Sequence, residues 1–160
     1  KMQVVVARLF HVIGPRSQPD RELSIFTEQI INNQPQVVHG HVSENGEFLS
    51  CSAGYTNIYE TVDGLVRAMT YNRSFDIFNI GSSVETTVYE IAKKAQEILG
   101  KNLEIIKKQM LPHEALRQSA DPEKAKRILD WEARTPVEHS IRQYIDWRLK
   151  TGPRLSAVYR

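Results

Sequence analysis

The sequence predicts an α/β fold, because segments with the pattern of strands alternate along it with segments that have the pattern of helices. The β-branched run Val4–Val6 is typical of a strand buried on both faces. Phe75–Ile80 is a second strong strand, closed by Gly81. Thr86–Leu99 is the clearest amphipathic helix, and Gly100 is a normal stop for it.

The composition is that of an ordinary globular protein. The chain has 160 residues, of which 41% are hydrophobic and 25% charged, with a net charge of +2; these values suit one domain with a real core. Its basic residues form no stripe, which argues against nucleic acid, and no apolar run approaches the roughly 18 residues of a membrane span. No secretory signal pattern is visible, and the single Cys51 excludes an internal disulfide. These features favour a cytoplasmic protein.

Periodicity and turn residues predict the remaining elements. Further helices are expected over Glu22–Asn32, Val62–Tyr71, Asp121–Leu129 and Val137–Leu149. Further strands are expected over Gln3–Phe10, Gln36–His39 and Leu103–Lys107. The Asn45-Gly46 pair favours a two-residue hairpin turn, whereas the small polar residues of Ser50–Thr56 predict a loop.

Two further features concern the surfaces of these elements. In the helix Val62–Tyr71, we expect Val62, Leu65, Val66 and Met69 to lie on one face. The first strand begins at residue 3, with nothing before it, although a parallel strand needs neighbours on both sides. We therefore expect the chain to be the rear part of a larger α/β unit.

Five segments resemble motifs of the extended short-chain dehydrogenase/reductases, in their nucleotide-sugar epimerase and dehydratase branch. RLFHVIGPR, at residues 8–16, is similar to the R-x-F-N-x-x-G-P-R signature. The helix at 22–32 resembles I-P-x-F-I-x-Q-I-L, and residues 56–69 resemble R-D-F-x-x-V-x-D-x-x-x-A. Residues 78–87 resemble Y-N-I-G-S-G-x-x-x-T, and residues 121–131 resemble D-x-x-K-A-x-x-x-L-G-W. The five occur in the family's order over nearly the whole chain.

The resemblance implies the rear part of a Rossmann-like parallel sheet plus the small α/β substrate-binding subdomain. Residues 1–150 would form this C-terminal substrate-binding portion, and residues 151–160 a frayed tail. It implies an NAD(P)-dependent nucleotide-sugar epimerase, dehydratase or reductase, which transfers a hydride at a sugar carbon. The family's glycine-rich turn and catalytic Tyr-x-x-x-Lys pair belong to its front half, which this sequence does not contain. We expect no catalytic residue in this chain, and no activity from it alone.

Tyr89 and Lys93 have the Tyr-x-x-x-Lys spacing, but they follow the RLFHVIGPR segment, whereas the family's catalytic pair precedes it. We therefore expect an ordinary surface pair on a helix face. His39, His41 and His113 have no fourth ligand at a sensible spacing, so we expect no metal site.

The resemblance also points to site residues around the first motif. Leu9 and Phe10 correspond to positions beside the nicotinamide, although core packing explains them equally well. His11 stands where the family usually has a substrate-binding Asn; a histidine can also donate and accept hydrogen bonds, but it can equally be a satisfied strand-end residue. Arg16 suits phosphate, or is a solvated cation in the turn.

The sequence departs from the family at two positions, which usually carry arginines that bind the nucleotide diphosphate. Asn57 stands where the family usually has one of them, which removes a charge at a cost of about 1–2 kcal/mol. Leu111 replaces the other, and we expect the downstream Arg117 either to supply the missing cation or to be a surface charge. The predicted substrate-binding residues are His11, Arg16, Asn57 and Arg117.

Three functional interpretations stay open. The chain is the substrate-binding portion of such an enzyme, or a non-catalytic binding or assembly module, or a chain that completes a separately encoded nucleotide-binding partner. The expected ligand is a nucleotide sugar, with NAD or NADP as the cofactor of the complete enzyme. No nucleic-acid or membrane partner is expected.

Overall fold

The computed structural model describes residues 2–72 and 75–152 as an α/β protein, as predicted. The helices are α1 (Glu22–Ile31), α2 (Ile58–Met69), α3 (Val88–Ile98), α4 (Glu123–Leu129) and α5 (Val137–Thr151). The strands are β1 (Val4–Leu9), β2 (His11–Ile13), β3 (Gln36–Val42), β4 (Phe48–Ser50), β5 (Ser52–Asn57), β6 (Phe75–Ile80), β7 (Glu85–Thr87), β8 (Ile105–Gln109) and β9 (Arg117–Gln118). None of the described helices is long and apolar enough to cross a bilayer.

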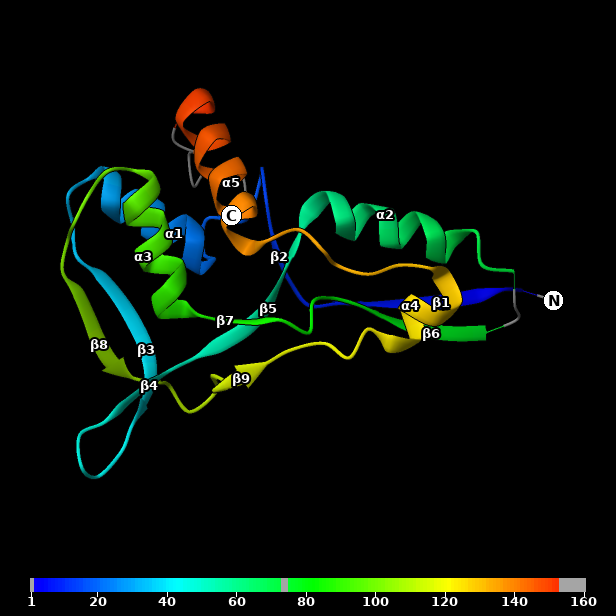
Figure 1. The fold of residues 1–160 in the computed structure, drawn as a ribbon, viewed down its shortest axis with the longest axis horizontal. Coiled ribbons are helices and arrows are strands. Elements are labelled where there is room, and N and C mark those ends of the chain that lie inside the picture. The colour runs from blue at the N-terminus through cyan, green and yellow to red at the C-terminus, as the bar shows by residue number, and fades with distance from the viewer. Residues whose placement is uncertain (1, 73–74, 153–160) are drawn as a thin grey trace.

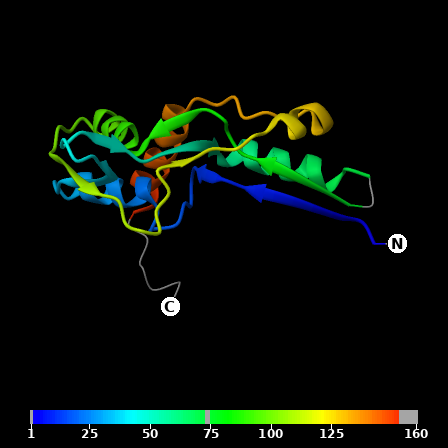
Figure 2. The same ribbon diagram turned by 90° about the horizontal axis from the view of Figure 1, so that it is seen from below.

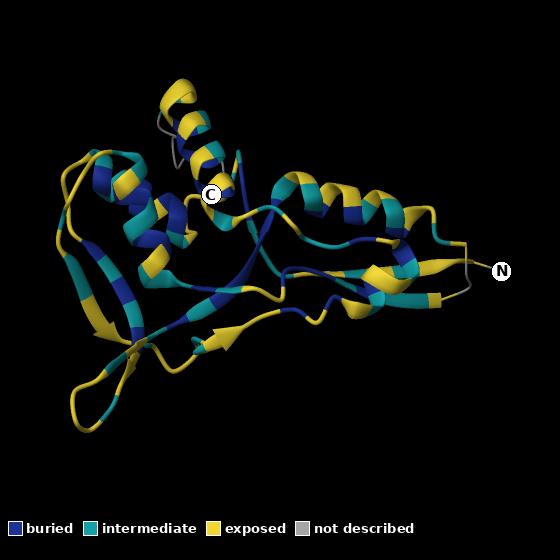
Figure 3. Cartoon of the chain, in the orientation of Figure 1, coloured by how far each residue is buried: buried dark blue, intermediate teal, exposed yellow. Residues whose placement is uncertain are grey.

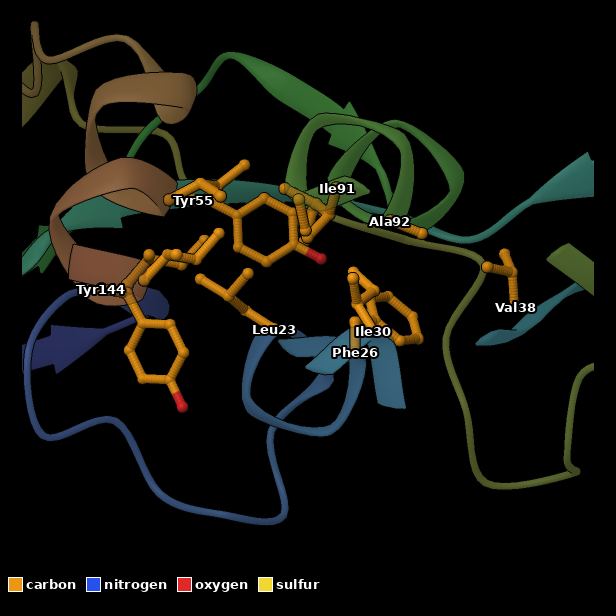
Figure 4. Close-up of a cluster of buried hydrophobic side chains, with 13 residues drawn as sticks. Leu23, Phe26, Ile30, Val38, Tyr55, Ile91, Ala92 and Tyr144 are labelled. Carbon is orange, nitrogen blue, oxygen red and sulfur yellow. The ribbon is translucent and has the colours of Figure 1, made fainter. Parts of the chain in front are cut away.

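The molecule is elongated and has a separate core at each end (Figures 1 and 2). One core lies between the β1–β6 pair, α2 and α4, and includes Phe78, Ile80 and Trp131. The larger core lies where α1, α3 and α5 pack against β3 and β5; Figure 4 shows Phe26, Ile30, Tyr55, Ile91 and Tyr144 within it. Strands β2 and β5 run through the middle and join the two ends.

Three small sheets organise these cores. β1 pairs with β6 in parallel, with Val6 opposite Ile77. β5 is central in the second sheet, where it is parallel to β2 and β9 and antiparallel to β7. β3 is parallel to β8 and antiparallel to β4. Because β1 leads directly into β2, the carboxyl end of β1 and the short strand after it lie beside β5.

The prediction that β1 is buried on both faces is wrong. Val4 and Val6 are 37% and 39% exposed, whereas Val5 and Ala7 pack against the first core. Side chains alternate between the faces of a strand, and α2 covers only one of those faces. Within the described part of the chain, β6 is the only strand that pairs with β1, so its other edge and one face are open (Figure 3).

Helix α2 does not pack through the face that carries its large apolar residues. The helix packs through the small residues Thr61, Gly64 and Ala68. A Cβ at Gly64 would lie 2.8 Å from an Ile80 side-chain atom and 2.9 Å from the Trp131 ring, so the helix approaches the sheet too closely for a larger residue. The apolar residues at helical spacing instead form an exposed surface, here called the α2 stripe: Tyr59, Val62, Val66 and Met69.

The predicted loop over Ser50–Thr56 contains the buried strand β5. Small residues belong there because neighbouring backbone lies almost in contact with it: a Cβ at Gly54 would lie 2.0 Å from the carbonyl oxygen of Ser82. The hairpin before it is longer than the two-residue turn predicted. The Ser43 N–H donates to the Glu47 carbonyl at 3.0 Å, and Gly46, with φ of +84°, takes the left-handed position.

Helix α5 is fixed to α1 by an ion pair. Arg148 is 6% exposed, and its Nη2 donates to Glu28 Oε2 at 2.7 Å. The helix continues to Thr151, at the start of the predicted frayed tail. The rest of that tail, residues 153–160, lies outside the described residues.

Candidate functional site

A cavity of about 640 Å³, here called cavity 1, lies beyond the carboxyl ends of β1 and β2. Residues 9–18 form much of its wall, because the chain passes from β1 through β2 into the turn at Gly14. Tyr55 of β5 and Gln118 of β9 close another side. Open α/β sheets bind ligands at this end of their strands, and the volume lies within the common range for small-molecule sites.

A second cavity of about 450 Å³, cavity 2, lies between the start of α1, strands β3 and β5, and residues 113–115. Both cavities are lined by the same five residues at their junction: His11, Arg21, Glu22, Tyr55 and Gln118. The two cavities therefore adjoin, and together they suit an elongated ligand rather than a compact one.

His11 lies at this junction. Its Nε2 is 2.6 Å from Gln118 Oε1, and its ring packs edge-on against Tyr55, with the ring centroids 5.4 Å apart. Leu9, Phe10 and Arg16 also line cavity 1. Arg16 is exposed and has a φ of +68°, which places it at the sharp turn after Gly14. The structure thus brings four of the six predicted site residues to one cavity.

Asn57 does not line either cavity. It is 3% exposed and caps α2: its Oδ1 accepts from the Tyr59 N–H at 2.9 Å. Its Nδ2 donates to Ser140 Oγ at 2.9 Å and to Gln143 Oε1 at 2.8 Å, which ties β5 to α5. The side chain is therefore engaged inside the protein, away from both cavities.

Arg117 also lies outside the two cavities. Its guanidinium makes a two-point ion pair with Glu85 of β7, at 2.9 and 3.0 Å. Its neighbour Gln118, which the sequence analysis did not single out, lines both cavities instead. Adjacent residues of a strand point to opposite faces, so only the register of β9 on β5 decides which of the two meets a ligand. No sequence signal distinguished them.

The Glu85–Arg117 pair gives a pH-dependent stability. The bonds from Arg117, Ser52 and Ser119 lower the pKa of Glu85 from 4.5 to about 2. A lowered pKa in the folded state stabilises the protein above pH 4.5, and this contribution is lost as the pH falls towards 2.

Between pH 4.5 and 2, we expect the free energy of unfolding to fall less in Glu85→Gln than in wild type. Urea unfolding at a series of pH values measures this difference. The exposed Glu97→Gln serves as control and keeps the wild-type slope; equal slopes for all three proteins would contradict the assignment.

Cavity 2 contains a second oriented histidine. His39 Nδ1 is 2.8 Å from Glu114 Oε1, and the Leu111 N–H donates to Glu114 Oε2 at 2.6 Å. Burial raises the pKa of Glu114, but the bonds from His39 and Leu111 outweigh it, so the pKa lies below the ordinary value. The carboxylate holds residues 111–114 against β3 and so shapes the cavity wall. His113 lines the same cavity, but within the described ranges no three His, Cys, Asp or Glu side chains gather as a metal site.

The Tyr89–Lys93 pair takes no part in either cavity. Tyr89 packs against the larger core, and the Lys107 ammonium lies 5.5 Å from the centre of its ring. Both residues are half-buried rather than on the surface, and neither lines a cavity.

The hydroxyl of Tyr55 is buried and has no hydrogen-bond partner among the described residues. Burial raises the pKa of this phenol, so the group stays neutral and lacks an acceptor for its proton.

We expect Tyr55→Phe to raise the free energy of unfolding by about 1 kcal/mol, because it removes an unsatisfied polar atom and keeps the ring. Chemical denaturation measures this, with the exposed Tyr59→Phe as an unchanged control. A loss of stability in Tyr55→Phe alone would show that the hydroxyl has a partner.

These features define an α/β protein of the Rossmann type with a ligand-sized site at the carboxyl ends of parallel strands. No protein-family model matches the chain. Among curated proteins, it is 28% identical to UDP-glucuronic acid decarboxylase 3 of Arabidopsis thaliana, over 88% of this chain and 39% of that protein. It is 24% identical to dTDP-D-glucose 4,6-dehydratase of Mus musculus, over 94% of this chain and 42% of that protein.

Solved structures agree with this relationship. UDP-glucose 4-epimerase of Thermotoga maritima, solved with UDP-glucose, is 27% identical with a TM-score of 0.78, over 92% of this chain and 46% of that one. UDP-glucuronic acid 4-epimerase of Bacillus cereus, in complex with UDP-glucuronic acid and NAD, has a TM-score of 0.80 at 22% identity, over 91% and 45% of the two chains. The chain is therefore similar to the C-terminal part of extended short-chain dehydrogenase/reductases of the epimerase and dehydratase branch. It spans less than half the length of the relatives named here.

Proposed function

We propose that this chain is the substrate-binding portion of an NAD(P)-dependent nucleotide-sugar epimerase, dehydratase or reductase. The observation that supports this most is cavity 1 at the carboxyl ends of β1 and β2, which is built on the motif at residues 8–16 and adjoins cavity 2. A nucleotide sugar is an elongated molecule, with a base at one end, a charged diphosphate in the middle and a sugar at the other end. It therefore suits the elongated space that the two adjoining cavities form. His11, Arg16 and Arg21 supply polar and cationic groups along its length.

The chain's own contribution to the cofactor is small. Leu9 and Phe10 present an apolar edge at cavity 1, which fits a nicotinamide ring. No glycine-rich turn for the dinucleotide pyrophosphate occurs in the 160 residues. When bound, NAD or NADP would supply hydride-transfer chemistry at the sugar carbon, and the residues of this chain would hold the substrate in place for it.

The open surfaces at the β1 end suit a nucleotide-binding half, on the same or on a separate chain. Parallel strands are normally paired on both edges and covered on both faces, whereas β1 exposes Val4 and Val6. The α2 stripe adds a second apolar surface, with Met69 83% exposed. We propose that the front half adds a strand or packs helices there, and that catalysis requires it.

A non-catalytic binding module is the second candidate. It is favoured by the placement of Asn57 and Arg117, because neither brings a charge into the cavities where the family uses arginines. In that case the site holds a ligand other than a nucleotide diphosphate sugar.

Calorimetry with UDP-, dTDP-, GDP- and CDP-sugars distinguishes the two candidates. We expect micromolar binding of at least one, and no turnover by this chain alone. His11→Ala should weaken binding about 10-fold, since a lost hydrogen bond costs about 1–1.5 kcal/mol, whereas Arg117→Ala should bind like wild type. Absence of heat across the whole panel would reject the enzyme assignment in favour of the second candidate.

A further inference from the structure

The hydrogen bond between His11 and Gln118 determines which ring nitrogen of His11 carries the proton. An amide oxygen can only accept, so at 2.6 Å from Gln118 Oε1 the Nε2 of His11 must donate. Neutral histidine has one protonated nitrogen, and Nδ1 is therefore a bare acceptor. Among the described residues, Nδ1 has no hydrogen-bond partner.

Two neighbours fix the ring in this state. Tyr55, buried in β5, packs against the ring edge-on at 5.4 Å. Gln118 is held beside β5 by the β9 pairing, in which it lies opposite Ala53. Both neighbours of His11 are thus positioned by the same buried strand, at the junction of the two cavities.

We propose that Gln118 is a positioning residue that fixes His11 as a hydrogen-bond acceptor for a hydroxyl group of the bound ligand. The identity of the ligand in this inference rests on the proposed function. Which ring nitrogen of His11 carries the proton does not depend on the proposed function. An asparagine amide, which the family usually has at this position, offers both a donor and an acceptor. His11 with its Nε2 occupied by Gln118 offers only an acceptor. Protonation of His11 removes that acceptor, so acid conditions weaken the contact.

The first test is a pH titration of His11 by NMR without ligand, in wild type, Gln118→Glu and Gln18→Glu. A carboxylate in place of the Gln118 amide lies against the imidazole, and we expect it to raise the protonation midpoint of His11 by about 1 pH unit. Gln18 also lines cavity 1, but the hydrogen bond of the His11 ring goes to Gln118. Gln18→Glu adds the same charge to the cavity without replacing that partner, so the midpoint of His11 should move far less in it. The other charged or titratable groups at the junction are Arg21, Glu22 and Tyr55, and all three are unchanged in these variants.

In wild type, the ring-nitrogen shifts of neutral His11 should show a protonated Nε2 and a bare Nδ1. A protonated Nδ1, or equal midpoint shifts in the two variants, would overturn the proposal whether or not any nucleotide sugar binds.

The second test follows UDP-glucose affinity across the same pH range. We expect the affinity for UDP-glucose to fall as His11 is protonated. In Gln118→Glu, the pH at which the affinity falls should rise by the same amount as the protonation midpoint of His11 measured by NMR. Stronger binding at low pH would show that His11 acts as a cation towards phosphate and would reject the acceptor role. Absence of UDP-glucose binding to wild type at every pH would reject the proposed ligand class, while the NMR result still decides the state of His11.

Discussion

Gly54→Ala is expected to unfold the protein or to lower its free energy of unfolding by about 3–5 kcal/mol. The new methyl group would lie 2.0 Å from the carbonyl oxygen of Ser82, and backbone cannot move aside as a flexible side chain does. The same oxygen accepts from the Ala120 N–H at 3.1 Å, so displacement would also break the contact between the β6–β7 turn and the segment before α4. Such a loss is a large part of a typical domain's stability.

The matched control is Gly46→Ala in the hairpin turn. A Cβ there meets no atom within 4 Å, so only its positive φ opposes the change, at a cost of about 1 kcal/mol. Urea unfolding of both variants gives the comparison. Equal losses would show that crowding around β5 is not the reason for glycine at position 54.

Asn57→Ala is expected to lower the free energy of unfolding by about 3–4 kcal/mol. It removes the cap of α2, worth about 1–2 kcal/mol, and two buried hydrogen bonds to α5, worth about 1 kcal/mol each. Thermal unfolding measures this loss, and the exposed Asn102→Ala should stay within about 0.5 kcal/mol of wild type.

The same variant separates a structural role from a binding role. At a temperature where Asn57→Ala is still folded, we expect it to bind the same nucleotide sugar with wild-type affinity, because Asn57 lines neither cavity. A variant of wild-type stability that no longer binds would show that Asn57 contacts the ligand after all.

Elements were predicted correctly where the local pattern of apolar residues determines the secondary structure. The strand Phe75–Ile80 and the helix around Ile91 and Ala95 are apolar at the right period, and both occur nearly as predicted. Strand β5 was missed because its small residues are selected by the distance to Ser82, which only the folded chain reveals. The packing face of α2 could not be predicted for a related reason: its close packing selects Gly64 and Ala68, and leaves the larger apolar residues outside.

The sequence analysis singled out cavity-lining residues where one segment carries them, and did not single them out where two segments meet. Leu9, Phe10, His11 and Arg16 lie on one cavity because they follow each other along the chain. Whether Gln118 or Arg117 lies at the cavities depends on the register of β9 against β5. The positions of Tyr55 and Glu22 in the cavity wall depend on the packing of β5 against α1. Asn57 was assigned to binding from a motif position, whereas its surroundings make it the cap of α2.

Amide and side-chain NMR shifts during titration with UDP-glucose give the most direct test of the combined site. Our account predicts that the largest changes occur at His11, Tyr55 and Gln118, and extend to Glu22 at the junction of the two cavities. Changes confined to the Glu85–Arg117 pair, or to the charged hollow formed by Glu60, Asp63 and Arg67, would place the ligand elsewhere and contradict it.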